Sequence, residues 1–97
     1  MEFNITIWVE DRFFKMHVTR VYASDQVERY EIKAGGRSVI LRNDRPLLRI
    51  SGSKKKPNWK VEQGAVANAG ALALTILELE KIIEEFGDVE GKINQVI

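Results

Sequence analysis

Strict alternation of apolar and polar residues at the start of the chain constrains the fold more than any other feature of the sequence. Between residues 3 and 9 every second residue is a large apolar one, which is the period of a strand with one buried face. Residues 14–18 repeat the pattern after Asp11-Arg12, a dipeptide suited to a two-residue hairpin loop. A loop there pairs Ile7 with Met16 and places every apolar pair on one face.

A second tight turn is predicted at Gly35-Gly36, because glycine adopts the positive φ angles that short hairpin loops need. Closing the chain there pairs Ile32 with Val39, again on one face. A further loop connects the strand that holds Val18 to the strand that holds Ile32. This loop needs an odd number of residues if Val18 is to stay on the same face. We therefore expect that loop at Ala23-Ser24-Asp25.

The meander is expected to continue after the second turn. A turn at Asn43-Asp44 brings Leu48 opposite Val39 in a fifth strand. After the polar loop 51–57, residues 58–62 form a sixth strand, with the proline of that loop suited to the beginning of an edge strand.

After Gly64 the apolar period changes to that of an α-helix. Five residues fall on one face at about 100° per residue: Leu72, Ile76, Leu79, Ile83 and Phe86. We expect a helix over residues 67–86, capped by Asn68 and ended by Gly87. The tail 88–97 keeps helical spacing and is compatible with a short second helix.

The predicted fold is therefore one α+β domain over residues 1–97. An antiparallel β-meander of five to six strands, within residues 3–62, is wrapped on one C-terminal α-helix. The helix stripe is the only large apolar surface available to cover the apolar face of the meander. A strongly curved sheet around the helix and an incomplete barrel plugged by it both satisfy this requirement. A chain of 97 residues fits one hydrophobic core.

The composition excludes several kinds of site. There is no cysteine, which rules out disulfides, thiolate zinc sites and cysteine nucleophiles. Carboxylates are scattered without the spacing of metal ligands, and no glycine pattern that cradles phosphate is present. We expect no metal, no cofactor and no small-molecule substrate. Without an apolar run of bilayer length or a signal peptide, the expected location is cytoplasmic, with no membrane partner.

His17, the only histidine, is the one candidate for acid–base catalysis. In the expected register His17 lies opposite Glu31, and Arg20 lies opposite Glu28. His17 is therefore expected to form a polar cross-strand pair on a solvated face. Nothing in the sequence completes a catalytic group around it. We expect a non-enzymatic protein, with an enzyme built around His17 as the minor hypothesis.

Positive charge is concentrated in one segment. Residues 37–60 hold eight basic side chains and one acidic side chain, a balance of +7. Residues 1–36 hold five basic and six acidic side chains, and residues 61–97 hold two and seven, giving −1 and −5. The three balances sum to the net charge of +1. Such a segment creates a local field that attracts anions.

Cations and an exposed aromatic ring on a sheet face can bind single-stranded nucleic acid, because phosphates contact the cations and bases stack on the ring. We expect Trp8 to contribute the ring and seven residues to contribute the charge: Arg29, Arg42, Arg49, Lys54, Lys55, Lys56 and Lys60. The alternative is a solvated face balanced by the acidic helix. Trp59, beside Lys60, fits either this surface or the core.

Apolar residues outside the core positions suggest self-association. The expected homodimer interface consists of residues on the outer sheet face and a leucine pair off the helix stripe: Trp8, Val21, Ile40, Leu47, Leu74 and Leu77. A protein-interaction or self-assembly module is therefore the alternative to nucleic-acid binding.

The order of elements, several strands followed by one long helix, resembles the Pur-type and Whirly-type single-strand-binding domains. The resemblance implies binding through a sheet face and dimerisation. Those domains have four strands per helix, whereas six are expected here.

Overall fold

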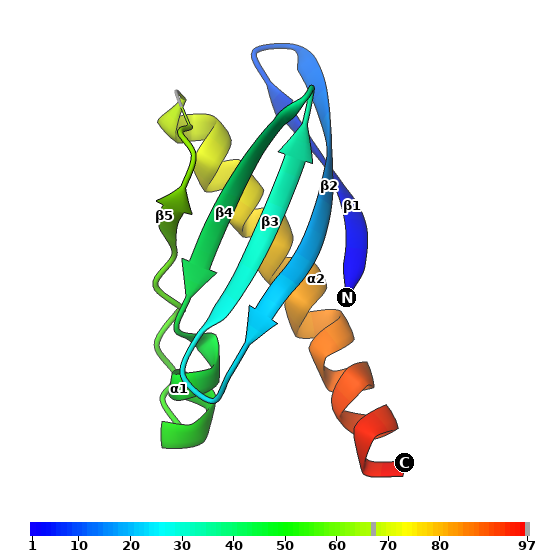
Figure 1. The fold of residues 1–97 in the computed structure, drawn as a ribbon, viewed down its shortest axis with the longest axis vertical. Helices are drawn as coiled ribbons and strands as arrows, with labels where there is room; N and C mark the ends of the chain where they lie inside the picture. The colour runs from blue at the N-terminus through cyan, green and yellow to red at the C-terminus, as the bar shows by residue number, and fades with distance from the viewer. Residues whose placement is uncertain (67, 97) are drawn as a thin grey trace.

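The computed structural model describes the backbone of residues 1–66 and 68–96, and the side chains of residues 1–66 and 68–85. Five strands form one antiparallel sheet in chain order: β1 (Glu2–Val9), β2 (Arg12–Ala23), β3 (Glu28–Ala34), β4 (Arg37–Asn43) and β5 (Lys60–Gln63). Helix α1 (Arg45–Ser51) lies between β4 and β5, and α2 (Ala69–Val96) follows β5. Figure 1 shows α2 crossing one face of the open, twisted sheet diagonally. The predicted α+β meander packed on a C-terminal helix is confirmed.

The β1–β2 hairpin turns at Glu10-Asp11, where both residues have positive φ angles of 50° and 65°. The predicted loop at Asp11-Arg12 is therefore wrong by one residue, and Ile7 pairs with Phe14 instead of Met16. The register differs by two residues, which is one full period of a strand. The same residues therefore stay on the inner face.

The connection between β2 and β3 also differs from the prediction. The strand β2 continues to Ala23, and the Ser24 hydroxyl accepts hydrogen bonds from the backbone N–H groups of Gln26 and Val27, each at 3.1 Å. A β-bulge between Arg20 and Tyr22 absorbs the extra residue. On the hairpin-tip side of the bulge, Val18 lies opposite Ile32 and stays on the inner face, as predicted.

The β3–β4 hairpin is as predicted. Gly35 and Gly36 have φ angles of 56° and 78°, and Ile32 pairs with Val39. Here the two glycines determine the loop position, because both central residues need positive φ.

The predicted fifth strand is wrong, because residues 45–51 form α1. Pro46 lies in the first turn, where a missing N–H is tolerated, and the Asn43 side chain accepts the Arg45 N–H at 2.8 Å. Gly52 ends the helix in the left-handed conformation, with φ of 70°. Leu48 is therefore not in the sheet, and the predicted sixth strand, observed as β5, pairs with β4.

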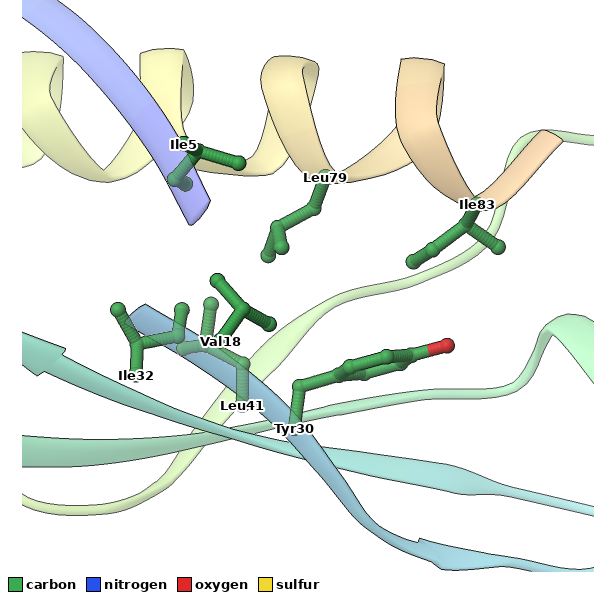
Figure 2. Close-up of a cluster of buried hydrophobic side chains, with 7 residues drawn as sticks. All are labelled: Ile5, Val18, Tyr30, Ile32, Leu41, Leu79 and Ile83. Atoms are coloured by element: carbon green, nitrogen blue, oxygen red, sulfur yellow. The ribbon is translucent and has the colours of Figure 1, made fainter. Parts of the chain in front are cut away.

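The core lies between the inner sheet face and α2. In Figure 2 the side chains of α2 point toward those of the sheet strands. Its buried members are Ile5, Val18, Tyr30, Ile32 and Leu41 from the sheet and Leu79 and Ile83 from α2. The predicted helix stripe is confirmed at these two residues and at the partly buried Leu72 and Ile76. The side chain of Phe86 lies outside the described residues.

The predicted cap of α2 is confirmed, but the helix begins at Ala69 instead of residue 67, and its predicted end is wrong. The Asn68 side-chain oxygen accepts the Ala71 N–H at 3.1 Å, as predicted for a cap. The helix continues through Gly87 to Val96, so the tail belongs to α2 and not to a second helix.

Removing a core contact of α2 should destabilise the protein strongly. We expect Leu79→Ala to lower the free energy of unfolding by about 2–5 kcal/mol, because the side chain is fully buried and leaves a cavity. Lys81→Ala, at an exposed position of the same helix, is the control and should cost less than about 0.5 kcal/mol. Urea unfolding followed by circular dichroism measures both, and equal losses would contradict the assigned core.

Candidate functional site

The face of the sheet opposite α2 is not covered by another element of the described chain (Figure 1). Because side chains alternate along a strand, the register identifies which residues lie on this outer face. They form rows across the sheet: Trp8 and Phe13; Thr6 and Lys15; Asn4, His17, Lys33 and Ser38; and Arg29, Arg42 and Lys60.

A hollow of about 740 Å³ lies between the middle of the β1–β2 hairpin and the tip of the β3–β4 hairpin. It exists because β2 and β3 pair only up to His17 and Lys33, after which β2 continues toward Arg12 without a partner on that side. Four basic side chains line the hollow: Lys15, His17, Lys33 and Arg37. Three neutral polar side chains, those of Asn4, Thr6 and Ser38, line it as well.

His17 is part of the wall of this hollow. Its Nδ1 atom is 2.9 Å from the Asn4 side-chain oxygen, and its Nε2 atom is 3.8 Å from a Glu2 carboxylate oxygen. The predicted pairing with Glu31 is wrong, because the register shift places His17 opposite Lys33. The expectation that His17 makes polar cross-strand contacts on an exposed face is nevertheless correct.

An aromatic pair lies beside the hollow on the same face. Trp8 and Phe13 are opposite each other, their rings are in contact, and they are 56% and 58% exposed. They are one strand period, about 7 Å, from the Thr6–Lys15 pair that lines the hollow. The outer face therefore presents two exposed, mutually tilted rings next to a basic depression.

The row of Arg29, Arg42 and Lys60 is adjacent in space, as the prediction requires, but Glu62 partly neutralises it. The Nε atom of Arg29 is 2.8 and 3.0 Å from the two Glu62 carboxylate oxygens, and the Nε atom of Arg42 is 3.8 Å from one of them. The Arg29 guanidinium also lies 4.6 Å from the centre of the Tyr22 ring. These arginines are engaged in an internal network, which lowers their availability to an anion.

The other predicted cations lie elsewhere. Arg49 is exposed on α1, not on a strand, and Lys54, Lys55 and Lys56 are exposed in the loop after α1. Figure 1 shows α1 at the end of the sheet opposite the hairpin tips. The basic segment 37–60 thus does not form one surface. Lys15 and Lys33 are not among the predicted cations, although strand alternation places them on the outer face.

The six residues predicted for a homodimer interface are distributed over the molecule. Trp8 and the half-buried Ile40 lie on the outer sheet face, and Val21 occupies the β-bulge. Leu47 is exposed on α1 instead of on a strand. Leu74 and Leu77 are exposed on α2, off the stripe that packs on the sheet. The leucine pair and the outer sheet face therefore belong to different sides of the molecule.

A buried polar cluster surrounds Glu28, which is 3% exposed. Tyr30 donates a hydrogen bond from its hydroxyl to the carboxylate at 3.1 Å, and Arg20 and Arg45 form ion pairs with it at 3.6 and 3.7 Å. Arg45 also donates to the Ile83 carbonyl at 3.4 Å, which links the cluster to α2. Burial, reinforced by the charge of Glu28, raises the pKa of the Tyr30 phenol. Because the carboxylate is sealed from solvent, we assign the cluster a structural role.

Trp59 belongs to the edge of the core. Its ring packs against Tyr30, and its Nε1–H donates to the Glu80 carboxylate at 3.0 Å. The sequence is compatible with Trp59 in the binding surface or in the core, and these contacts place it in the core.

Within the described residues, no group of three His, Asp or Glu side chains is placed to hold a metal ion. No helix in that part of the chain is long and apolar enough to cross a membrane.

No protein-family model matches the chain, and no curated protein or solved structure is significantly similar to it. The resemblance to Pur-type and Whirly-type domains thus rests on the order of elements alone. The sheet has five strands, one more than those domains have for each helix.

Removing the Tyr30 hydroxyl should change how stability depends on alkaline pH. The unfolded phenol has a pKa of about 10, and the folded one is higher. The unfolded state therefore loses its proton first, and the stabilisation from this group falls as pH rises above about 10. Tyr30→Phe should lower the free energy of unfolding by about 1–2 kcal/mol at neutral pH, because Glu28 loses a buried donor.

The difference between the wild type and Tyr30→Phe should shrink between neutral pH and about pH 11, as measured by urea unfolding. Tyr22→Phe, which removes the same hydroxyl from the exposed outer face, is the matched control at neutral pH and should cost less than about 0.5 kcal/mol. A constant difference for Tyr30→Phe would contradict the raised pKa.

Proposed function

We propose that this protein is a non-enzymatic domain that binds single-stranded nucleic acid on the outer face of its sheet. The observation that supports this proposal best is the basic hollow beside the exposed Trp8–Phe13 pair. Phosphates supply most of the affinity in such complexes, and stacked bases supply the rest.

The phosphates would contact Lys15 and Lys33, which approach the hollow from β2 and β3. Lys33 has a carboxylate neighbour, Glu31, at 3.4 Å, but its ammonium group is largely exposed. Exposed ion pairs contribute little free energy, so a phosphate displaces Glu31 at small cost. Asn4, Thr6 and Ser38 add neutral hydrogen-bonding groups to the same wall.

The bases would stack on Trp8 and Phe13. Stacking on an aromatic side chain contributes about 1–3 kcal/mol per base and tolerates any base. In a duplex the base faces are already stacked, so the rings favour single strands. The proposal therefore implies binding with little sequence preference and strong dependence on salt.

Substitutions matched in charge test whether the site is the hollow or the whole basic surface. Lys15→Ala with Lys33→Ala should weaken binding of a labelled oligothymidylate, measured by fluorescence anisotropy over a series of salt concentrations. If both lysines contact phosphates, the slope of log affinity against log salt should decrease by about 1.4, or 0.7 per contact. Lys54→Ala with Lys55→Ala removes the same charge from the loop after α1 and should leave the slope nearly unchanged.

Trp8→Ala supplies the independent test of stacking and should lower affinity about 5- to 150-fold at constant salt. Leu47→Ala, which removes an exposed apolar side chain from α1, is its control. Absence of binding by the wild type at low salt would overturn the proposal. Equal losses in the two lysine double variants would do the same, because they would indicate attraction by net charge alone.

Self-assembly through α2 is the second candidate function. Leu74 and Leu77 are 39% and 48% exposed, off the buried stripe of the helix. A pair of leucines one helical turn apart is a suitable centre for contact with the same helix of a second copy.

If α2 mediates a homodimer, light scattering should report twice the mass of the chain, and Leu74→Ser with Leu77→Ser should convert it to monomer. The double variant should keep the oligonucleotide affinity of the wild type, since the outer sheet face is on the other side of the sheet from α2 (Figure 1). A wild-type monomer at all concentrations would exclude this candidate.

A further inference from the structure

An apolar groove of about 300 Å³ lies under the inner sheet face, between the β1–β2 hairpin and the first turns of α2. Farther along α2, Leu79 and Ile83 fill the space between the helix and the inner sheet face. Nearer the start of α2, the side chain of Ala71 is too small to fill the corresponding space. Phe14 in the wall of the groove therefore remains 41% exposed, and Leu72 is only partly buried.

The groove has one charged side chain in its lining, that of Arg37. Arg37 alternates with Val39 and Leu41 on β4, which places it on the inner face, at the point where the sheet opens between the hairpin tips. It is exposed and forms no ion pair with the residues that the structure describes. Arg37 also lines the basic hollow, which lies on the outer-face side of the gap between β2 and β3.

The other polar groups in the lining are already engaged. Thr75 donates from its hydroxyl to the Ala71 carbonyl at 2.7 Å, and the Asn68 side-chain oxygen accepts the Ala71 N–H. The groove thus combines an apolar interior with one unpaired guanidinium at its edge, a group that pairs well with a carboxylate.

We propose that this groove binds a medium-chain fatty acid, with the alkyl chain against Phe14 and Leu72 and the carboxylate on Arg37. An apolar cavity of about 150 Å³ holds a benzene ring, so twice that volume holds a chain of about ten carbons. This volume is at the lower end of small-molecule sites and is too small for a partner helix. A neutral hydrocarbon would leave Arg37 unused, which is why the charge selects an anionic amphiphile.

Calorimetric titration with hexanoate, octanoate and decanoate, below their micelle concentrations, tests the alkyl part of the site. Affinity should rise about fourfold for every added methylene up to decanoate. Ala71→Phe should abolish decanoate binding by filling the groove, while Ala73→Phe, at an exposed position of the same helix, should not. Circular dichroism and urea unfolding of both variants check that they remain folded.

Decanoate and decanol together test the carboxylate part. Arg37→Gln should lower decanoate affinity about tenfold or more and leave decanol affinity unchanged. Arg49→Gln, which removes an exposed arginine from α1, is the matched control. Oligonucleotide binding by Ala71→Phe should equal that of the wild type, so failure of this proposal is distinguishable from failure of the nucleic-acid proposal.

Three results would overturn the fatty-acid site. The first is an affinity that does not depend on chain length. The second is an equal effect of Arg37→Gln and Arg49→Gln on decanoate. The third is a wild-type dimer that Ala71→Phe dissociates, because the groove would then be occupied by a second copy of the chain.

Discussion

The packing of the α2 stripe on the inner sheet face is the interaction on which the rest of the structure depends. A meander with one apolar face needs a second layer to remove that face from water, and α2 supplies it through Leu79 and Ile83. The sheet is twisted and α2 crosses it diagonally (Figure 1). The helix therefore covers a diagonal band and leaves the hairpin tips uncovered. Both the basic hollow and the apolar groove lie in the half of the sheet that ends at those tips.

The distribution of charge follows from the same geometry. The basic segment holds its cations in three different environments. Arg45 is drawn into the cluster around Glu28, Arg42 shares Glu62 with a neighbouring arginine, and the lysines of the loop after α1 remain exposed at the far end. A charge balance along the chain cannot separate these environments, because ion pairing depends on contacts between distant residues. The cations that line the hollow come mainly from outside this segment, on β2 and β3, and the segment contributes Arg37 at the start of β4.

The sequence predicts the faces of the strands better than their registers. Alternation assigns Ile5, Val18 and Ile32 to the core correctly, but a slip of two residues leaves alternation unchanged, so it cannot locate the loops before Gly35. The glycine pair locates its own turn because of its φ angles. Helix α1 was missed, although Pro46 and Gly52 mark its limits, because Leu48 also fits a strand. The hollow was beyond prediction, since it arises where β2 and β3 diverge.

The contact between α2 and β1 joins the first strand of the chain to its last helix. Ile5 and Leu79 are 74 positions apart, a separation that takes roughly 4–15 s to synthesise at about 5–20 residues per second. During that interval the inner face of the growing sheet has no cover and can pair with other apolar surfaces. The final core therefore forms only after synthesis of the helix, and protection of the nascent chain depends on how soon α2 leaves the ribosome.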